Sequence, residues 1–187
     1  MAWESWCSSL ARAGVDGLQV REKALSDREV WHLVTAARRA FPRPGRLVVS
    51  SRPDLAAAGD ADGVQLPVEG LPIAAARALL GPRRLIGRST HSLDEIRAAQ
   101  AEGADYVLYG PIFPTPSKAG RLAPRGVSSL VEATKLGLPV IALGGIGRGE
   151  AAAIREAGAW GIAGIRLFSP AALAGPELLA LRRLWTD

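Results

Sequence analysis

One local pattern recurs along the chain and constrains its fold more than any other. A helical segment ends at a glycine, a short polar connection follows, and an apolar strand begins; the stretches 13–20, 58–66, 102–107 and 157–162 all show this order. Strands that alternate strictly with helices lie parallel in one sheet, because each helix must return the chain to the same edge. The pattern therefore predicts an α/β fold built on a parallel sheet.

Hydrophobic periodicity and turn residues between these junctions predict seven strands and eight helices. The predicted strands cover residues 16–23, 46–50, 62–66, 85–89, 104–110, 139–143 and 161–165. The predicted helices cover residues 2–13, 26–40, 54–58, 73–80, 93–102, 127–136, 150–157 and 177–185, with a short helical turn from Ser169.

A doubly wound sheet and a (β/α)8 barrel both accommodate this alternation. The (β/α)8 barrel of the TIM type is favoured, because the units are uniform and the polar clusters follow strands, which places them at one end. We expect a single domain over residues 1–187. The count is one strand short of eight, the first predicted element is a helix, and such barrels usually need at least about 200 residues. The first strand is therefore expected to be missing.

The segment 139–147 combines a buried strand with a glycine turn and the start of a helix. Gly144, Gly145 and Gly147 follow the strand, and helical sequence resumes at Glu150. Glycines let backbone N–H groups approach an anion, and a helix N-terminus favours negative charge. This order indicates a phosphate site, although a tight turn without a ligand would use the same residues.

The charge, the cysteine count and the apolar runs of the sequence limit which partners and locations are expected. The chain has a formal net charge of +5, but its basic residues are scattered among acidic ones, so we expect no nucleic acid; an anionic small molecule or a basic surface explains the charge. Cys7 is the only cysteine, which excludes an internal disulfide and a thiol cluster for metal. No apolar run is long enough for a membrane and no signal peptide is apparent, so a cytoplasmic location is expected.

Five motifs carry a resemblance to a known family. They are QVREK at 19–23, VQLP at 64–67, IGRSTHSL at 86–93, DYVLYGPIFPT at 105–115 and ALGGI at 142–146. The sequence from Gly14 to about Ser169 resembles the superfamily of thiamine phosphate synthase and the TenI-type thiazole tautomerases. The resemblance implies a (β/α)8 barrel that binds a thiazole phosphate at the carboxyl ends of its strands.

The two branches of that superfamily differ at positions visible here. The resemblance implies that a synthase holds Mg²⁺ through an Asn-Asp pair and a further aspartate, where this chain has Ser50, Ser51 and Gly70. Serine hydroxyls are poor Mg²⁺ ligands compared with carboxylates, and Glu69 would act alone. A typical tautomerase has a catalytic histidine where this chain has Pro111.

The short motifs Gln65-Leu66-Pro67 and Arg88-Ser89 resemble the tautomerase branch, whereas the segment 110–115 resembles the synthase. A TenI-type tautomerase, which shifts a proton to aromatise the ring, is the expected function. Thiamine phosphate synthase and a non-catalytic regulatory barrel remain as alternatives. No cofactor is expected, and Mg²⁺ only in the synthase alternative. The expected partner is a thiazole phosphate, and a homo-oligomer is one state that open strand edges would allow.

The candidate site residues lie in these motifs, in the long loop after residue 110, or at or just after the ends of predicted strands. Arg21 and Lys23 alternate along the end of a strand with Glu22 between them, and could hold an anion rather than form a solvated charge cluster. His91 lies just after the end of a predicted strand and could move a proton as histidines do, although a histidine at such a position more often fixes a loop. The catalytic candidates are His91, Glu69 and Lys118; the binding candidates are Gln19, Arg21, Lys23, Ser50, Ser89, Thr115, Ser117, Lys118, Gly144, Gly145, Ile165 and Arg166. No metal ligand is expected.

Overall fold

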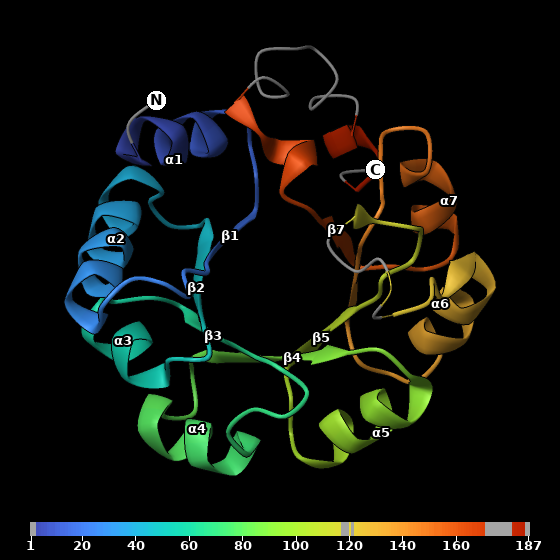
Figure 1. Cartoon of the computed structure of the whole chain (residues 1–187), viewed down its shortest axis with the longest axis horizontal. Helices are drawn as coiled ribbons and strands as arrows, with labels where there is room; N and C mark the ends of the chain where they lie inside the picture. The colour runs from blue at the N-terminus through green and yellow to red at the C-terminus, as the bar shows by residue number, and fades with distance from the viewer. Residues whose placement is uncertain (1–2, 117–119, 121, 171–180, 186–187) are drawn as a thin grey trace. The chain divides into compact units, whose positions relative to one another are not determined.

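Helices and strands alternate along the chain in the computed structural model, as the glycine-terminated junctions predict (Figure 1). The structure describes residues 3–116, 120, 122–170 and 181–185. The chain divides into two units, Met1–Gly87 and Arg88–Asp187, so the prediction of a single domain stays a prediction.

The first unit contains three strands that pair in the order of the sequence. Strand β1 pairs with β2 and β2 with β3, all parallel, with Gln19 level with Val48 and Ser50 level with Gln65. The carboxyl ends of the three strands therefore lie at one edge. The elements of this unit are α1 (Trp3–Arg12), β1 (Gly17–Val20), α2 (Asp27–Ala40), β2 (Arg46–Ser50), α3 (Pro53–Ala58), β3 (Gly63–Leu66), α4 (Ile73–Leu80) and the start of β4 (Leu85–Thr90).

The second unit repeats this arrangement with its own parallel strands. Strand β5 pairs with β6 and β6 with β7, with Tyr109 level with Ala142 and Leu143 level with Ala163. Its elements are the end of β4, α5 (Leu93–Ala101), β5 (Tyr106–Tyr109), α6 (Gly126–Thr134), β6 (Val140–Leu143), α7 (Ala151–Glu156), β7 (Gly161–Ala163) and the 3₁₀ helix η2 (Arg166–Phe168).

Local sequence explains where these elements start. Ser26 caps α2 in a capping box with Glu29, and the bonds from Ser26 hold the pKa of the Glu29 carboxyl below its ordinary value. Ser92 caps α5 by accepting a hydrogen bond from the N–H of Glu95. All four residues of β3 are buried, as expected for a parallel strand covered on both faces. In each unit the helices pack against the strands they connect (Figure 1).

Most predicted elements agree with the structure to within a few residues. The seven strands in the described residues match the predicted count, and helix α1 comes before β1. The 3₁₀ helix η2 ends before Ser169, Pro170 is helical, and the rest of the turn predicted from Ser169 lies outside the described residues. The predicted helix 177–185 lies mostly outside the described residues. None of the described helices combines the length and apolar composition needed to cross a membrane.

Candidate functional site

In the first unit, polar side chains gather at the carboxyl ends of β1, β2 and β3. The side-chain amide of Gln19 donates a hydrogen bond to the Ser50 hydroxyl at 2.6 Å. Ser50 is level with the buried Gln65 on the neighbouring strand, so the strand alternation puts all three side chains on one face of the sheet. The structure thus brings together two predicted residues and adds Gln65.

Strand β1 ends at Val20, so the predicted strand over 16–23 is wrong at its end: Arg21, Glu22 and Lys23 follow β1 as exposed residues. Within the described part of the chain, neither basic side chain makes an ion pair or a hydrogen bond. Guanidinium and ammonium groups without a carboxylate partner are suited to a phosphate. The anion-binding role of these two residues stays a prediction.

The loop after β2 is held by an arginine that the sequence analysis did not single out. Arg52 donates to both carboxylate oxygens of Asp54 at 2.7 and 3.0 Å and pairs with Asp27 at the start of α2. The guanidinium holds the pKa of both carboxyls below their ordinary values. The sequence offered only the neighbouring Asp54 as a partner, because Asp27 lies on another element.

The positions at which the synthase branch would hold Mg²⁺ lie at the end of β2, at Ser50 and Ser51, and in the loop after β3, at Gly70. The Ser50 hydroxyl is bonded to Gln19, and Glu69 is exposed. Among the residues described, no group of three or more His, Cys, Asp or Glu side chains could hold a metal ion. Divalent magnesium prefers carboxylate oxygens, so the donor set here does not fit a resident Mg²⁺.

In the second unit, the end of β4 carries the predicted binding residue Ser89 next to Arg88. Arg88 is buried and pairs with Glu102 beyond helix α5 at 3.0 Å. Successive side chains of a strand alternate between faces, so Ser89 lies on the face opposite Arg88. Arg88 points to the side of the sheet that helix α5 covers, so Ser89 points to the other side. A side chain that binds a ligand must lie on that other side.

His91 is fixed by bonds on two sides. Its backbone N–H donates to the Glu95 carboxylate at 2.6 Å, and its ring Nδ1 contacts the Gly110 carbonyl oxygen. A carbonyl can only accept a hydrogen bond, so Nδ1 is the donor in this contact. The histidine therefore ties the end of β4 to the end of β5, and its neutral form presents Nε2 as an acceptor.

The glycine turn after β6 supports the loop that follows β5. Gly144 and Gly145 have φ of 94° and 66°, a region that favours glycine. A Cβ on Gly145 would lie 2.5 Å from the Pro114 carbonyl oxygen, and the N–H of Phe113 donates to the Gly144 carbonyl at 3.0 Å. Contact within the protein already requires these glycines, and it places the start of the long loop, including Thr115, beside the turn.

The predicted phosphate anchors lie on neighbouring strand ends. Leu143 is level with Ala163, so Gly144-Gly145 and Ile165-Arg166 follow adjacent parallel strands. Ile165 is 85% exposed and Arg166 is exposed as well, which leaves this region accessible to a ligand. The N–H of Gly147, in contrast, donates to the Glu150 carboxylate at 2.8 Å.

A cavity of about 840 Å³ opens in the long loop between β5 and α6. Thr115 lines it among four prolines and apolar side chains, a surface suited to an aromatic ring. Ser117 and Lys118, both predicted to bind phosphate in this loop, lie outside the described residues. Elsewhere, burial raises the pKa of the Cys7 thiol to about 11, so this cysteine stays protonated at neutral pH and is no nucleophile.

Comparison with known proteins identifies the family. The family model described as thiamine monophosphate synthase matches residues 2–168. A putative thiamine-phosphate synthase of Geobacter sulfurreducens is 48% identical over 166 residues, covering 88% of this chain and 76% of that protein. The thiamine-phosphate synthase of Anaeromyxobacter dehalogenans is 45% identical over 180 residues, covering 92% of this chain and 79% of that protein.

A solved structure of thiamine phosphate pyrophosphorylase from Pyrococcus furiosus superposes with a TM-score of 0.85 at 30% identity, covering 97% of this chain and 88% of that one. The likeness confirms the predicted α/β fold of the TIM-barrel type, here with seven described strands. The relatives are named as synthases, so the prediction of a TenI-type tautomerase is wrong. The short motifs that favoured the tautomerase extend over few residues, whereas the similarity to synthases extends over most of the sequence. The chain belongs to the thiamine monophosphate synthase family.

Proposed function

We propose that this chain is a thiamine-phosphate synthase, a transferase that joins a pyrimidine pyrophosphate to a thiazole phosphate. The observation that carries the proposal is the 48% and 45% identity, over most of the chain, to relatives that bear this name. The polar residues at the carboxyl ends of the strands agree with it, because parallel barrels of this class place their chemistry there.

The second unit offers what a thiazole phosphate requires. Backbone N–H groups near Gly144-Gly145 and Ile165-Arg166 follow neighbouring strands, and such groups bind phosphate oxygens well. Thr115 adds a hydroxyl, and the cavity beside it has the apolar lining that a heterocycle needs. These residues would hold the phosphate and orient the ring.

The first unit offers positive charge and hydrogen-bonding groups. Joining the two rings requires pyrophosphate to leave, and negative charge develops on it as it departs. Arg21 and Lys23 are exposed beside the hydrogen-bonded Gln19 and Ser50, so they can meet that charge. The departure makes no demand on a proton acceptor, so we propose that His91 positions the β5 loop and that Glu69 is not a base.

The donor set at Ser50, Ser51 and Gly70 does not fit Mg²⁺, so the proposed mechanism relies on the chain's own basic side chains and needs no resident cofactor. Lys118 would add to that charge, although it lies outside the described residues. The proposed ligands are small phosphate and pyrophosphate esters.

The test is an assay of thiamine phosphate formation by the purified chain from the two substrates. We expect product, and we expect the double variant Arg21→Ala/Lys23→Ala to lower kcat by about 10²-fold, the usual cost of losing a charge-stabilising group. Arg97→Ala, which removes a charge on the surface of α5, should leave the rate unchanged.

A chain that binds thiazole phosphate tightly but forms no product would contradict the synthase. That result would favour the alternative of a non-catalytic regulatory barrel. The observation in its favour is that Ser50 and Ser51 stand where a synthase would have metal ligands.

A further inference from the structure

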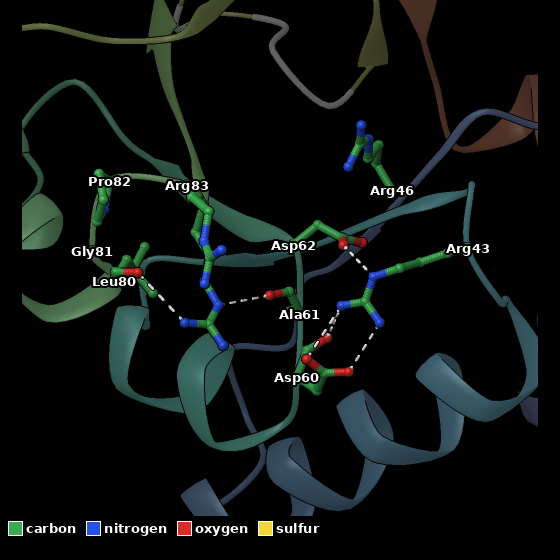
Figure 2. Close-up of a pocket in the computed structure, with 10 residues that line it drawn as sticks. Arg43, Arg46, Asp60, Ala61, Asp62, Leu80, Gly81, Pro82 and Arg83 are labelled. Carbon is green, nitrogen blue, oxygen red and sulfur yellow. Dashed lines mark hydrogen bonds and ion pairs between the residues drawn. The ribbon is translucent and has the colours of Figure 1, made fainter.

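A second polar cluster lies at the amino ends of the strands in the first unit. A cavity of about 370 Å³ opens there, between the residues that precede or begin β2, β3 and β4 (Figure 2). Strand β2 begins at Arg46 in this cavity and ends at Ser50 in the candidate site, so the two sites are separated by roughly 13 Å along the strand. The charged residues that line the cavity are Arg43, Arg46, Asp60, Asp62, Arg83 and Arg84.

The two carboxylates of the cavity are already engaged. Arg43 donates to Asp60 and Asp62, each at 3.1 Å, and Figure 2 shows its guanidinium pointing at both. Asp62 also accepts from Arg38 at 2.6 Å and from the Leu47 N–H at 2.8 Å. The negative charge on this side is thus shared between two guanidinium groups.

Arg84 is held by neutral groups. Its guanidinium donates to the carbonyl oxygens of Ala61 at 3.1 Å and Leu80 at 3.4 Å. Carbonyl partners fix the side chain in place without cancelling its charge. Arg84 therefore presents a positioned positive charge to the cavity.

Arg46 and Arg83 complete the lining, and both are exposed. Among the residues described, neither guanidinium makes a hydrogen bond or an ion pair; Arg46 stands apart from the dashed contacts in Figure 2. Four arginines and two aspartates line the cavity, which leaves a surplus of two positive charges. A concave surface concentrates such a field.

We propose that this cavity binds a small polyanion that carries two or more phosphate groups. The surplus charge calls for more than one negative charge, and guanidinium groups bind phosphate oxygens in bidentate pairs. A volume of about 370 Å³ lies near the lower limit of ligand pockets and accommodates a short phosphate chain. Free inorganic polyphosphate and the phosphates of a nucleotide share this chemistry.

The test uses the full chain with Arg21→Gln and Lys23→Gln, so that binding at the opposite ends of the strands is weakened, and inorganic tripolyphosphate as the probe. Calorimetry should show one site. Adding Arg46→Gln and Arg83→Gln should weaken it at least tenfold, while Arg97→Gln together with Arg28→Gln, which removes the same charge elsewhere, should leave the dissociation constant within about twofold.

Arg46→Lys/Arg83→Lys should retain part of the affinity, because the charge remains while the bidentate geometry is lost. ATP that binds more tightly than tripolyphosphate would identify a nucleotide as the source of the phosphates, and equal affinity would identify the phosphate chain alone. Thermal midpoints of all variants should lie close together, since Arg97 loses only its exposed pair with Asp94 and the other replaced side chains have no partner among the residues described. Absence of binding, or equal weakening by the Arg28/Arg97 pair, would overturn the proposal.

Discussion

At the scale of single residues, Gly144 and Gly145 in the turn after β6 have no side chain, and this leaves room both for a phosphate and for the loop that follows β5. A turn that admits a phosphate and a turn that admits the β5 loop both need glycine. The structure shows the second need directly, since a Cβ on Gly144 or Gly145 would lie 2.5 Å from Pro111 or Pro114 atoms. Substitution there should therefore disturb the loop and the ligand together.

Gly145→Val is expected to weaken binding of thiazole phosphate at least tenfold. Its φ of 66° is strained for a β-branched residue, and the new side chain meets the carbonyl oxygens of Phe113 and Pro114 at 2.7 and 2.5 Å. Calorimetry measures the affinity and circular dichroism checks the fold. Gly149→Ala is the matched control, because its Cβ meets nothing within 4 Å; unchanged affinity in folded Gly145→Val would refute the site.

Ser51 offers a gain-of-function prediction. Its φ of 61° is a conformation that aspartate tolerates well. Ser51→Asp with Gly70→Asp would supply two carboxylates where the resemblance implies metal ligands, and should raise thiamine phosphate formation by roughly 10–10³-fold with Mg²⁺ present. EDTA should return the variant to the wild-type rate. Equal rates with and without Mg²⁺ would show that these positions cannot hold the ion.

At the scale of elements, ion pairs connect helices to strands across long stretches of sequence. Asp62 at the start of β3 accepts from Arg38 on α2 and from the Leu47 N–H on β2. Its side chain is only 6% exposed, so each lost partner leaves a buried polar group. Asp60, two residues earlier, has a side chain that is 63% exposed and pairs with the likewise exposed Arg43.

Asp62→Asn is expected to lower the free energy of unfolding by about 3 kcal/mol, because it leaves the Arg38 guanidinium without its charged partner. That loss corresponds to a fall in Tm of roughly 6–12 °C for a chain of this size. Asp60→Asn should cost less than about 1 kcal/mol, as exposed pairs do. Chemical denaturation measures both, and equal losses would show that burial does not decide the difference.

The Arg52 contacts predict a dependence of stability on pH. In the folded chain, Arg52 lowers the pKa of Asp27 on α2 and of Asp54 on α3. The stabilisation is therefore complete above the ordinary aspartate pKa of about 3.9 and is lost as pH falls through the lowered values. We expect Asp27→Asn/Asp54→Asn to lose Tm at pH 7 and to show a smaller further loss on acidification than the wild type. Parallel pH curves would argue against the contribution.

At the scale of the whole molecule, family membership depends on the whole sequence, whereas the need for a metal ion depends on a few residues. Similarity over most of the chain shows the family. Ser50, Ser51 and Gly70 lack the carboxylates that Mg²⁺ prefers. The whole enzyme should accordingly differ from a metal-dependent synthase in how it responds to chelation.

We expect thiamine phosphate formation by the wild-type chain to persist in EDTA, at a rate within about twofold of that measured with Mg²⁺. The physical reason is that Arg21 and Lys23, rather than a bound ion, meet the charge on the leaving pyrophosphate. The assay should follow product with and without the chelator at matched ionic strength. A loss of about 10² or more in EDTA would show that the chain holds its metal through groups other than the predicted ones.

The sequence by itself determined the alternation of elements and the strand ends near which several candidate residues lie. Helix α2 follows from the Ser26 capping box, β3 from a short apolar run, and the strand-end positions of Gln19 and Gly145 from the motifs around them. These are local signals, because hydrogen bonds within a turn and the side-chain period of a strand act over few residues. The prediction of the tautomerase branch was wrong because it depended on two short, isolated motifs.

Only the tertiary structure decided which distant groups meet. The pairing of Arg52 with Asp27, the contact of His91 with Gly110 and the sharing of Asp62 join elements that lie 15 to 25 residues apart in the chain. The arginine-lined cavity at the amino ends of β2 to β4 likewise exists only in the folded chain. Such contacts depend on strand register and helix packing, which bring side chains together without leaving a local pattern in the sequence.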